Sequence, residues 1–189
     1  SAYIVGEAWA DQNTYAQFYR SGIDSLFDFA FAGRDGTISR VMNGAEGLRY
    51  FAESMVREEE LYAALNPSFV NAPFYSNHDM DRGAEYYAEG DAAKVKLAEA
   101  LNLLMTGNAF IYYGEELGMR GAGRDENRRA PMCWSDDPHA PGMCSGPAGM
   151  DEIRKEFGSL ENQMSDPDSI FSYIREAVRI RESLPVIGR

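Results

Sequence analysis

Acidic side chains follow two short apolar runs of the chain, and their positions suit acid–base chemistry. Glu7 comes just after the run at residues 3–5, and Asp79 comes after the run at residues 74–76. The carboxyl ends of parallel strands meet on one rim of a sheet, where the active sites of α/β barrels form. Glycoside hydrolysis needs two carboxyl groups beside the scissile bond, one as proton donor and one as nucleophile or base. Two rim carboxylates therefore suit a glycosidase, although many barrel enzymes place acids there for other chemistry.

Short apolar runs alternate with longer helical patterns, and these elements must position the two acids. Continuous apolar runs are typical of strands buried on both faces of a parallel sheet. We expect strands at 3–5, 26–31, 74–76 and 110–113. We expect helices at 14–20 and 45–66, and a last one from a cap at Asp168 or Ser169 to Pro185. A further helix is expected between the cap Asp91 and the terminating Gly107, with an apolar face of Leu97, Leu101, Leu104 and Met105. This order predicts an α/β protein with four consecutive βα units.

Two architectures accommodate four βα units: an open doubly wound sheet, or half of a (β/α)8 barrel. Gly6 stands alone after the first run, which disfavours a glycine-rich dinucleotide loop. The alternation breaks at about residues 118–166, which are rich in Gly, Pro, Asp and Arg and predict a long loop excursion. A single domain over residues 1–189 is the simplest division.

Composition excludes some classes of partner. The formal net charge of -12 leaves no basic stripe to meet nucleic-acid phosphates, whereas it is compatible with an uncharged sugar.

No apolar run approaches the ~20 residues that cross a membrane. Cys133 and Cys144 fit either a disulfide or two free thiols, and their surroundings do not predict a metal site. Neither an initiator methionine nor a signal peptide is visible, so the sequence leaves the cellular compartment open.

Several segments resemble motifs of the alpha-amylase family of glycoside hydrolases, and they occur in family order. YIVGEAW (3–9) resembles the fifth-strand motif, SNHDMDR (76–82) the seventh, and GNAFIYYGEELGM (107–119) the eighth strand with its following turn. LFDFAF (26–31) stands where the sixth strand belongs, and RRAPMCW (128–134) and the segment 163–185 resemble the family's usual sequel. The resemblance implies the C-terminal half of a (β/α)8 TIM barrel, strands five to eight.

The resemblance also implies roles for individual residues. Glu7 would be the general acid/base, which requires partial burial or a neighbouring carboxylate to keep its proton. Asp79 would stabilise the transition state. The remaining substrate-binding residues would be His78, Asn77, Trp9 and Arg82. Trp9 is equally compatible with packing, Arg82 with holding the loop or orienting a carboxylate, and the segment 77–79 with a structural turn.

Other polar and aromatic residues receive structural interpretations. Tyr112 and Tyr113 are expected in the barrel core, with a place in the site as the alternative. Glu115 and Glu116 are expected to form a helix-start or rim pair. We expect a solvated loop network from the charged residues Asp125, Arg128 and Arg129.

The family's nucleophile is an Asp at the end of the fourth strand, which would precede Ser1. Asp11, Asp24 and Asp28 do not lie in a matching context. The resemblance implies a retaining mechanism, so the isolated chain is expected to be inactive while a longer parent protein hydrolyses alpha-glucosidic bonds. Hydrolase and transglycosylase activity both stay open, and any calcium is expected in other parts of the parent barrel.

Two partners follow from these expectations. One is an alpha-glucan oligosaccharide. The other is whatever covers the open edges of a half barrel: the N-terminal half of the same barrel, a second copy of the chain, or the long loop. The alternative functions are a non-catalytic amylase-like scaffold and a sugar-binding domain.

Overall fold

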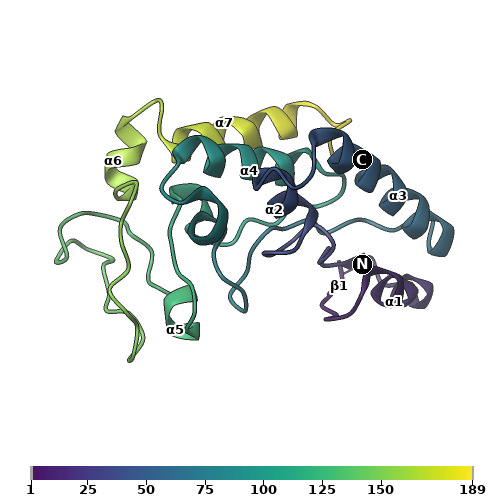
Figure 1. The fold of residues 1–189 in the computed structure, drawn as a ribbon, viewed down its shortest axis with the longest axis horizontal. Helices are drawn as coiled ribbons and strands as arrows, with labels where there is room; N and C mark the ends of the chain where they lie inside the picture. The colour runs from purple at the N-terminus through teal and green to yellow at the C-terminus, as the bar shows by residue number, and fades with distance from the viewer. Residues whose placement is uncertain (1, 189) are drawn as a thin grey trace.

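The structure is a computed structural model that describes residues 2–188. Short elements predominate near the N-terminus, and longer helices follow (Figure 1). In chain order the elements are strand β1 (Val5–Gly6), α1 (Gln12–Ala16), the 3-10 helix η1 (Gln17–Ser21), strand β2 (Ser25–Leu26), α2 (Thr37–Met42), α3 (Leu48–Leu65), the π-helical turn η2 (Ala84–Ala88), α4 (Ala92–Leu104), the 3-10 helix η3 (Glu115–Leu117), α5 (Asp125–Arg128), α6 (Leu160–Ser165) and α7 (Ile170–Ser183).

Regular sheet is limited to one parallel pair of strands. β1 and β2 lie side by side, with Val5 opposite Ser25. The connection between them is helical, through α1 and η1, as a parallel pair requires. The first of the expected βα units is therefore present, with strands shorter than predicted.

The third and fourth expected strands are extended segments without regular strand pairing. A single parallel bridge joins Phe27 to Ala72. The N–H of Phe110 donates to the carbonyl of Pro73 at 2.7 Å, which ties the fourth segment to the third. Pro73 has no N–H to return to the ladder, which interrupts pairing at this position. The order of the four segments is kept, but the expectation of four full βα units is not confirmed among residues 2–188.

Helix α4 begins where the sequence predicts but buries only part of the predicted apolar face. Asp91 caps it, accepting a hydrogen bond from the Ala93 N–H at 2.9 Å. The prediction that Leu97 and Leu104 face the core is wrong, because Leu104 is 52% exposed and Leu97 is exposed as well. The predicted Leu101 and Met105 are buried, and the buried face also carries Val95, Ala98, Glu99, Asn102 and Leu103. Periodicity found the helix, but two nearly equivalent apolar faces left its orientation to tertiary packing.

Helix α7 lies alongside α4 across one side of the molecule (Figure 1). Ser169 caps it by accepting from the Ser172 N–H at 3.1 Å, which decides between the two expected caps. Ile170 and Ile174 face inward, as predicted. The helix ends at Ser183, just before Pro185.

Three features were not expected from the sequence. Helix α2 and the turn η2 fall in stretches without a predicted element. The excursion at residues 118–166 carries two short helices, α5 and α6, at the left of Figure 1. It is therefore an ordered structure that packs beside η2 and α7 rather than a bare loop.

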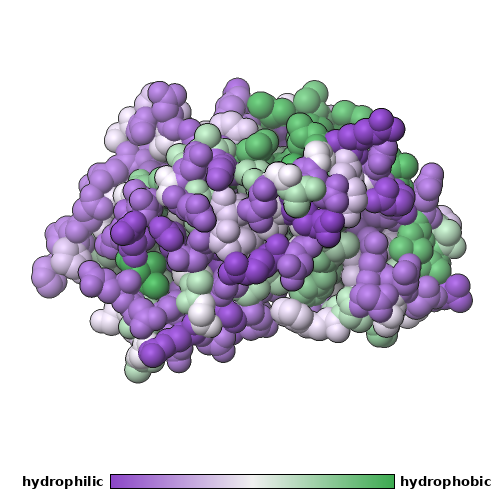
Figure 2. Space-filling model, in the orientation of Figure 1, coloured by the Kyte–Doolittle hydropathy of each residue, from purple (hydrophilic) through white to green (hydrophobic). Residues whose placement is uncertain are grey.

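Two apolar clusters form the interior. The larger lies between α2, α3, α4 and α7, and the smaller joins α1, η1 and β2 through Tyr15, Tyr19, Leu26 and Tyr62. Apolar side chains also reach the surface over α4 and α7 (Figure 2), where Leu97, Leu104 and Ile180 are exposed. Within residues 2–188, no helix is both long enough and apolar enough to cross a bilayer.

Candidate active site

A cleft of about 180 Å³ lies where the extended segments end. Glu7 follows β1 and lines it on one side, and Asn77 and His78 line it on another. Aromatic side chains, including Phe27 and Tyr112, supply the apolar part of the wall. Three of the predicted site residues, far apart in sequence, therefore share one cleft.

Glu7 is held by a tryptophan two residues later. The indole N–H of Trp9 donates to Glu7 Oε1 at 2.6 Å. The indole ring packs on Phe29 with a centroid distance of 4.8 Å, yet Trp9 is 62% exposed. Glu7 itself is exposed, so the partial burial expected of a proton donor is not present in this chain. Trp9 is an orienting partner of Glu7 and leaves much of its ring surface open.

The segment 77–79 forms a turn that presents a carboxylate. Asn77 Oδ1 accepts from the N–H of Asp79 at 2.9 Å, a local bond typical of an Asx turn. The Asp79 carboxylate lies 3.3 Å from His78 Nε2 and accepts from Arg129 Nη2 at 2.9 Å. Its side chain is 40% exposed. Asp79 stands at the rim beside the cleft, and both of its oxygens are occupied.

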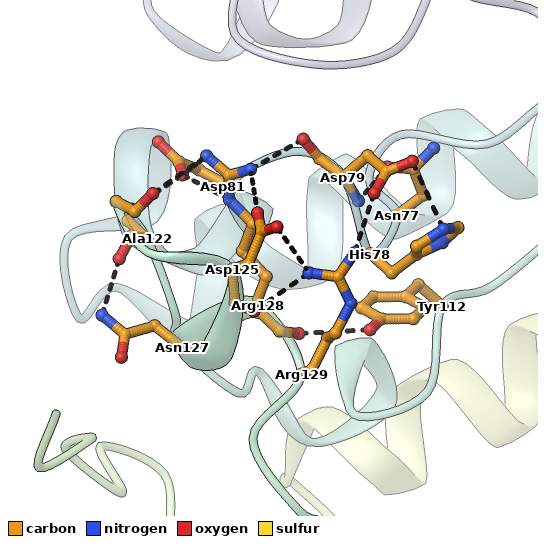
Figure 3. A network of polar contacts seen from close by, with 11 residues as sticks. Asn77, His78, Asp79, Asp81, Tyr112, Ala122, Asp125, Asn127, Arg128 and Arg129 are labelled. Atoms are coloured by element: carbon orange, nitrogen blue, oxygen red, sulfur yellow. Dashed lines mark hydrogen bonds and ion pairs between the residues drawn. The ribbon is translucent and has the colours of Figure 1, made fainter. Parts of the chain in front are cut away.

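The excursion docks on this turn through a network of arginines and aspartates (Figure 3). Arg128 Nη1 donates to the carbonyl of Asp79 at 2.8 Å, and its guanidinium pairs with Asp81 at 3.2 Å. Asp125 pairs with both Arg128 and Arg129. The expected loop network is present, and it reaches the predicted site rather than standing apart in solvent.

Arg82 lies beneath the turn and not in the cleft. Its side chain is fully buried, at 0% exposure. Nη1 donates to the carbonyl of Tyr113 at 2.7 Å, and Nε donates to the carbonyl of Arg128 at 3.2 Å. The guanidinium stacks over the Tyr112 ring at 4.5 Å. In this structure Arg82 holds the loop, because its Nε and Nη1 donate to backbone carbonyls and its side chain does not line the cleft.

The two tyrosines are not core residues as the sequence suggested. Tyr112 lines the cleft and its hydroxyl donates to the carbonyl of Arg128 at 3.1 Å. Tyr113 is exposed, and its hydroxyl donates to the carbonyl of Ala130 at 2.8 Å. The prediction failed because both hydroxyls find acceptors on the excursion, which periodicity does not reveal.

A buried carboxyl lies behind the cleft, and the sequence did not single it out as buried. Glu115 begins η3, as the helix-start interpretation expects, but it is almost fully inaccessible. Its Oε1 accepts from the Ser76 hydroxyl, and its Oε2 accepts from the Tyr112 N–H at 2.8 Å. Burial raises the pKa of Glu115 to about 8. The sequence offers one signal for this residue: it is an acid that directly follows an apolar run and Gly114.

Glu99 of α4 is a second buried carboxyl in the same region. Burial raises its pKa well above the usual value, and the neighbouring Glu115 carboxyl raises it further. The Tyr75 hydroxyl beside it lowers that pKa in part. Glu99 and Glu115 are thus neighbouring buried acids behind the site.

Another buried acidic pair joins α3 to the segment after β2. Asp28 accepts from the Tyr15 hydroxyl at 3.1 Å, and Glu58 accepts from the Asn71 amide at 2.7 Å. Burial raises the pKa of both carboxyls, that of Glu58 further because Asp28 is beside it. Asp28 is therefore a buried acid whose carboxyl group is held by Tyr15 and Asn71.

The described residues contain no group of three or more His, Cys, Asp or Glu arranged to hold a metal ion. Both cysteines are free thiols, Cys133 buried and Cys144 exposed. The disulfide alternative is therefore not realised in this structure.

Known proteins resemble this chain over nearly its whole length. The family model "Alpha amylase, catalytic domain" matches residues 1–188. Alpha-amylase 3 of Dictyoglomus thermophilum is 32% identical over 95% of this chain, which covers 35% of that protein. Alpha-amylase SusG of Bacteroides thetaiotaomicron is 30% identical over 98% of this chain, which covers 26% of that protein.

Solved structures also superpose on this chain over nearly its whole length. Eubacterium rectale Amy13B superposes with a TM-score of 0.96 at 46% identity, covering 100% of this chain and 37% of its own. The alpha-amylase from H. orenii superposes with a TM-score of 0.80 at 28% identity, covering 99% of this chain and 37% of its own. The chain therefore spans between 26% and 37% of the length of these relatives. Family model, relatives and fold agree, and the chain belongs to the alpha-amylase catalytic-domain family.

Proposed function

We propose that this chain is part of a glycoside hydrolase that cleaves alpha-glucosidic bonds of starch- or maltodextrin-like substrates. The observation that carries the proposal is the shared cleft of Glu7, Asn77 and His78, with Asp79 fixed at its rim. Relatives named alpha-amylase and 4-alpha-glucanotransferase match most of the chain, which is consistent with an alpha-glucan substrate.

In this proposal Glu7 donates a proton to the leaving-group oxygen and later accepts one from water. Asp79 strengthens its interaction with the sugar as positive charge develops on the ring, and His78 donates a hydrogen bond to the same sugar. Asn77 shapes the turn, and Trp9 orients Glu7 while offering a face for stacking. Arg82 supports the turn from below.

The nucleophile would come from residues outside this chain, together with the partner that completes the barrel. No aspartate of this chain is proposed for that role. Because members of a catalytic set act together, the lack of the nucleophile is expected to cost orders of magnitude in rate. We therefore expect the isolated chain to show no turnover of a maltooligosaccharide.

The test compares the purified chain with a longer parent protein on maltoheptaose, with reducing-end release as the readout. The parent should cleave it, and Glu7→Gln in the parent should lower kcat by about a thousandfold or more. Glu46→Gln is the control, since Glu46 lies on the surface paired with Arg40. Turnover by the chain alone, or full activity of the Glu7→Gln parent, would contradict the proposal.

A sugar-binding domain without turnover is the second candidate. The observation that favours it is the open face of Trp9 beside the cleft, since exposed aromatic rings stack on sugars. If this candidate is correct, maltoheptaose should quench tryptophan fluorescence of the chain and Trp9→Ala should abolish the quenching. A parent that binds maltoheptaose without cleaving it would favour this candidate over the hydrolase.

A further inference from the structure

We propose that Glu115 is a positioning residue that clamps two walls of the cleft together and thereby sets the place of His78 and Asp79. The inference rests on the proposed function for its catalytic consequence, but the clamp itself is a property of this chain. Glu115 does not line the cleft, so it would act only through the residues that do.

Both carboxylate oxygens of Glu115 are used, and they reach different walls. Oε1 accepts from the hydroxyl of Ser76, the residue before the 77–79 turn. Oε2 accepts from the backbone N–H of Tyr112, at 2.8 Å. Ser76 and Tyr112 both line the cleft. A single side chain therefore bridges the third and fourth extended segments at the point where regular strand pairing is missing.

The base of the clamp is fixed. The N–H of Glu115 donates to the carbonyl of Tyr112 at 3.0 Å, which closes a tight turn. Gly114 makes this turn with φ of 87°, a conformation that favours glycine. On the far side, the amide of Gln163 donates to the carbonyl of Leu117 at 3.0 Å and anchors η3 to α6. The side chain thus leaves a rigid support.

A carboxyl group suits this position better than an amide or a hydroxyl group. Two donors arrive from opposite sides, and a carboxyl offers an acceptor to each, whereas a glutamine offers one acceptor and two further donors. An alanine would leave the Ser76 hydroxyl and the Tyr112 N–H buried without partners, which is costly. Small displacements of the cleft walls matter, because moving a catalytic group by about 1 Å can lower the reaction rate about a hundredfold.

Glu58 provides a matched control. It is also a buried glutamate, but its carboxyl group accepts from Asn71 and Gln12, neither of which lines the cleft. Glu58→Gln therefore removes a buried acid without touching the clamp. Ser76→Ala removes the opposite end of the clamp while keeping the volume of the site nearly constant.

The first test uses the chain itself and is independent of activity. The sequence has two histidines, His78 beside the cleft and His139 in the excursion, so imidazole 1H–13C NMR signals report on the turn and supply an internal reference. Glu115→Ala and Ser76→Ala should shift the His78 signals in the same way, and the double variant should add little further. His139 signals should stay unchanged, as should the His78 signals in Glu58→Gln.

The second test is kinetic and uses the parent protein with maltoheptaose. Ser76→Ala and Glu115→Ala should lower kcat by about tenfold to a hundredfold with KM changed by less than about twofold. An inactive wild-type parent would refute the proposed function while the NMR experiment still tests the clamp. The clamp is overturned if His78 signals match wild type in folded Ser76→Ala, or if Glu58→Gln shifts them equally.

Discussion

At the scale of single residues, the acids of this chain divide by what surrounds them. Glu7 and Asp79 are exposed and are held by neighbours, Trp9 in one case and Arg129 in the other. Glu99, Glu115 and Glu58 are buried and have raised pKa values. The exposed acids can meet a substrate, whereas the buried ones can only shape the structure around it. The same residue type therefore serves two purposes, and burial decides which.

Arg129→Met tests whether the excursion fixes Asp79. The substitution removes the guanidinium that pairs with the Asp79 carboxylate at 2.9 Å and keeps a long apolar side chain. In the parent protein, kcat/KM on maltoheptaose should fall about tenfold, because Asp79 loses one of its two partners. Stability of the chain should change by less than about 1 kcal/mol, as for other exposed ion pairs.

Arg124→Met is the control for this prediction. Arg124 comes from the same excursion and pairs with Asp151 at 3.8 Å, away from the 77–79 turn. Its kcat/KM should stay within about twofold of wild type. Equal losses in both variants would show that the excursion acts through its overall charge or folding and not through Asp79.

At the scale of elements, polar contacts join segments that strand-to-strand hydrogen bonds would join in a regular barrel. The third and fourth segments are joined by isolated backbone bonds and by Glu115. Helix α3 is fixed to the sheet by the Asp28–Glu58 pair together with Asn71 and Tyr62. Such buried networks fix one arrangement when they are satisfied, but their strength depends on protonation.

The Asp28–Glu58 pair makes stability depend on pH in a definite direction. In the unfolded chain a glutamate titrates at about 4.3, and burial raises the pKa of Glu58 well above that in the folded chain. At a pH above the unfolded-state pKa, the folded state holds more protons than the unfolded chain. The free energy of unfolding should therefore fall as the pH rises from about 5 to about 8. Urea unfolding across this range measures the slope, which should be shallower for Glu58→Gln.

Glu53→Gln is the control on the same helix. Glu53 is half exposed and pairs with Arg49 at 2.8 Å on the outer face of α3. Its slope should equal that of wild type. If Glu58→Gln unfolds with the wild-type slope, the pair does not carry the pH dependence that its burial indicates.

At the scale of the whole molecule, apolar side chains remain exposed beside a strand edge and over two helices. β1 lies at the edge of its sheet, and Ile4 and Tyr3 beside it are exposed. Leu104 and Ile180 are exposed over α4 and α7 (Figure 2). Open strand edges and exposed apolar side chains favour association with another chain or segment. In a longer parent protein the missing part of the barrel would take that place.

Ile4→Lys tests whether the edge at β1 drives self-association of the isolated chain. A charge on an edge strand opposes pairing with a second strand, so the variant should elute as a 21.1 kDa monomer while wild type elutes earlier. Val56→Lys is the control, because Val56 is equally exposed but lies on helix α3. A monomeric wild type that binds no apolar dye would rule out the association.

Local sequence determined the parts of this protein that depend on neighbouring residues. The helices around the caps Asp91 and Ser169, the order of the extended segments, and the placing of Glu7 and the 77–79 turn after apolar runs were predictable. So was the family, from motifs that resemble it in order. These features need only short-range patterns and chain order.

Tertiary structure alone decided which side chains meet across long separations. It buried Arg82 and Glu115, turned Leu104 outward, paired Arg129 with Asp79, and shortened the expected strands. The reason is physical: the cost of burying an ionisable group falls where partners from distant segments arrive, here Tyr113 for Arg82 and Ser76 for Glu115. Those partners are fixed by how the excursion and η3 fold back on the cleft, and no local pattern encodes that.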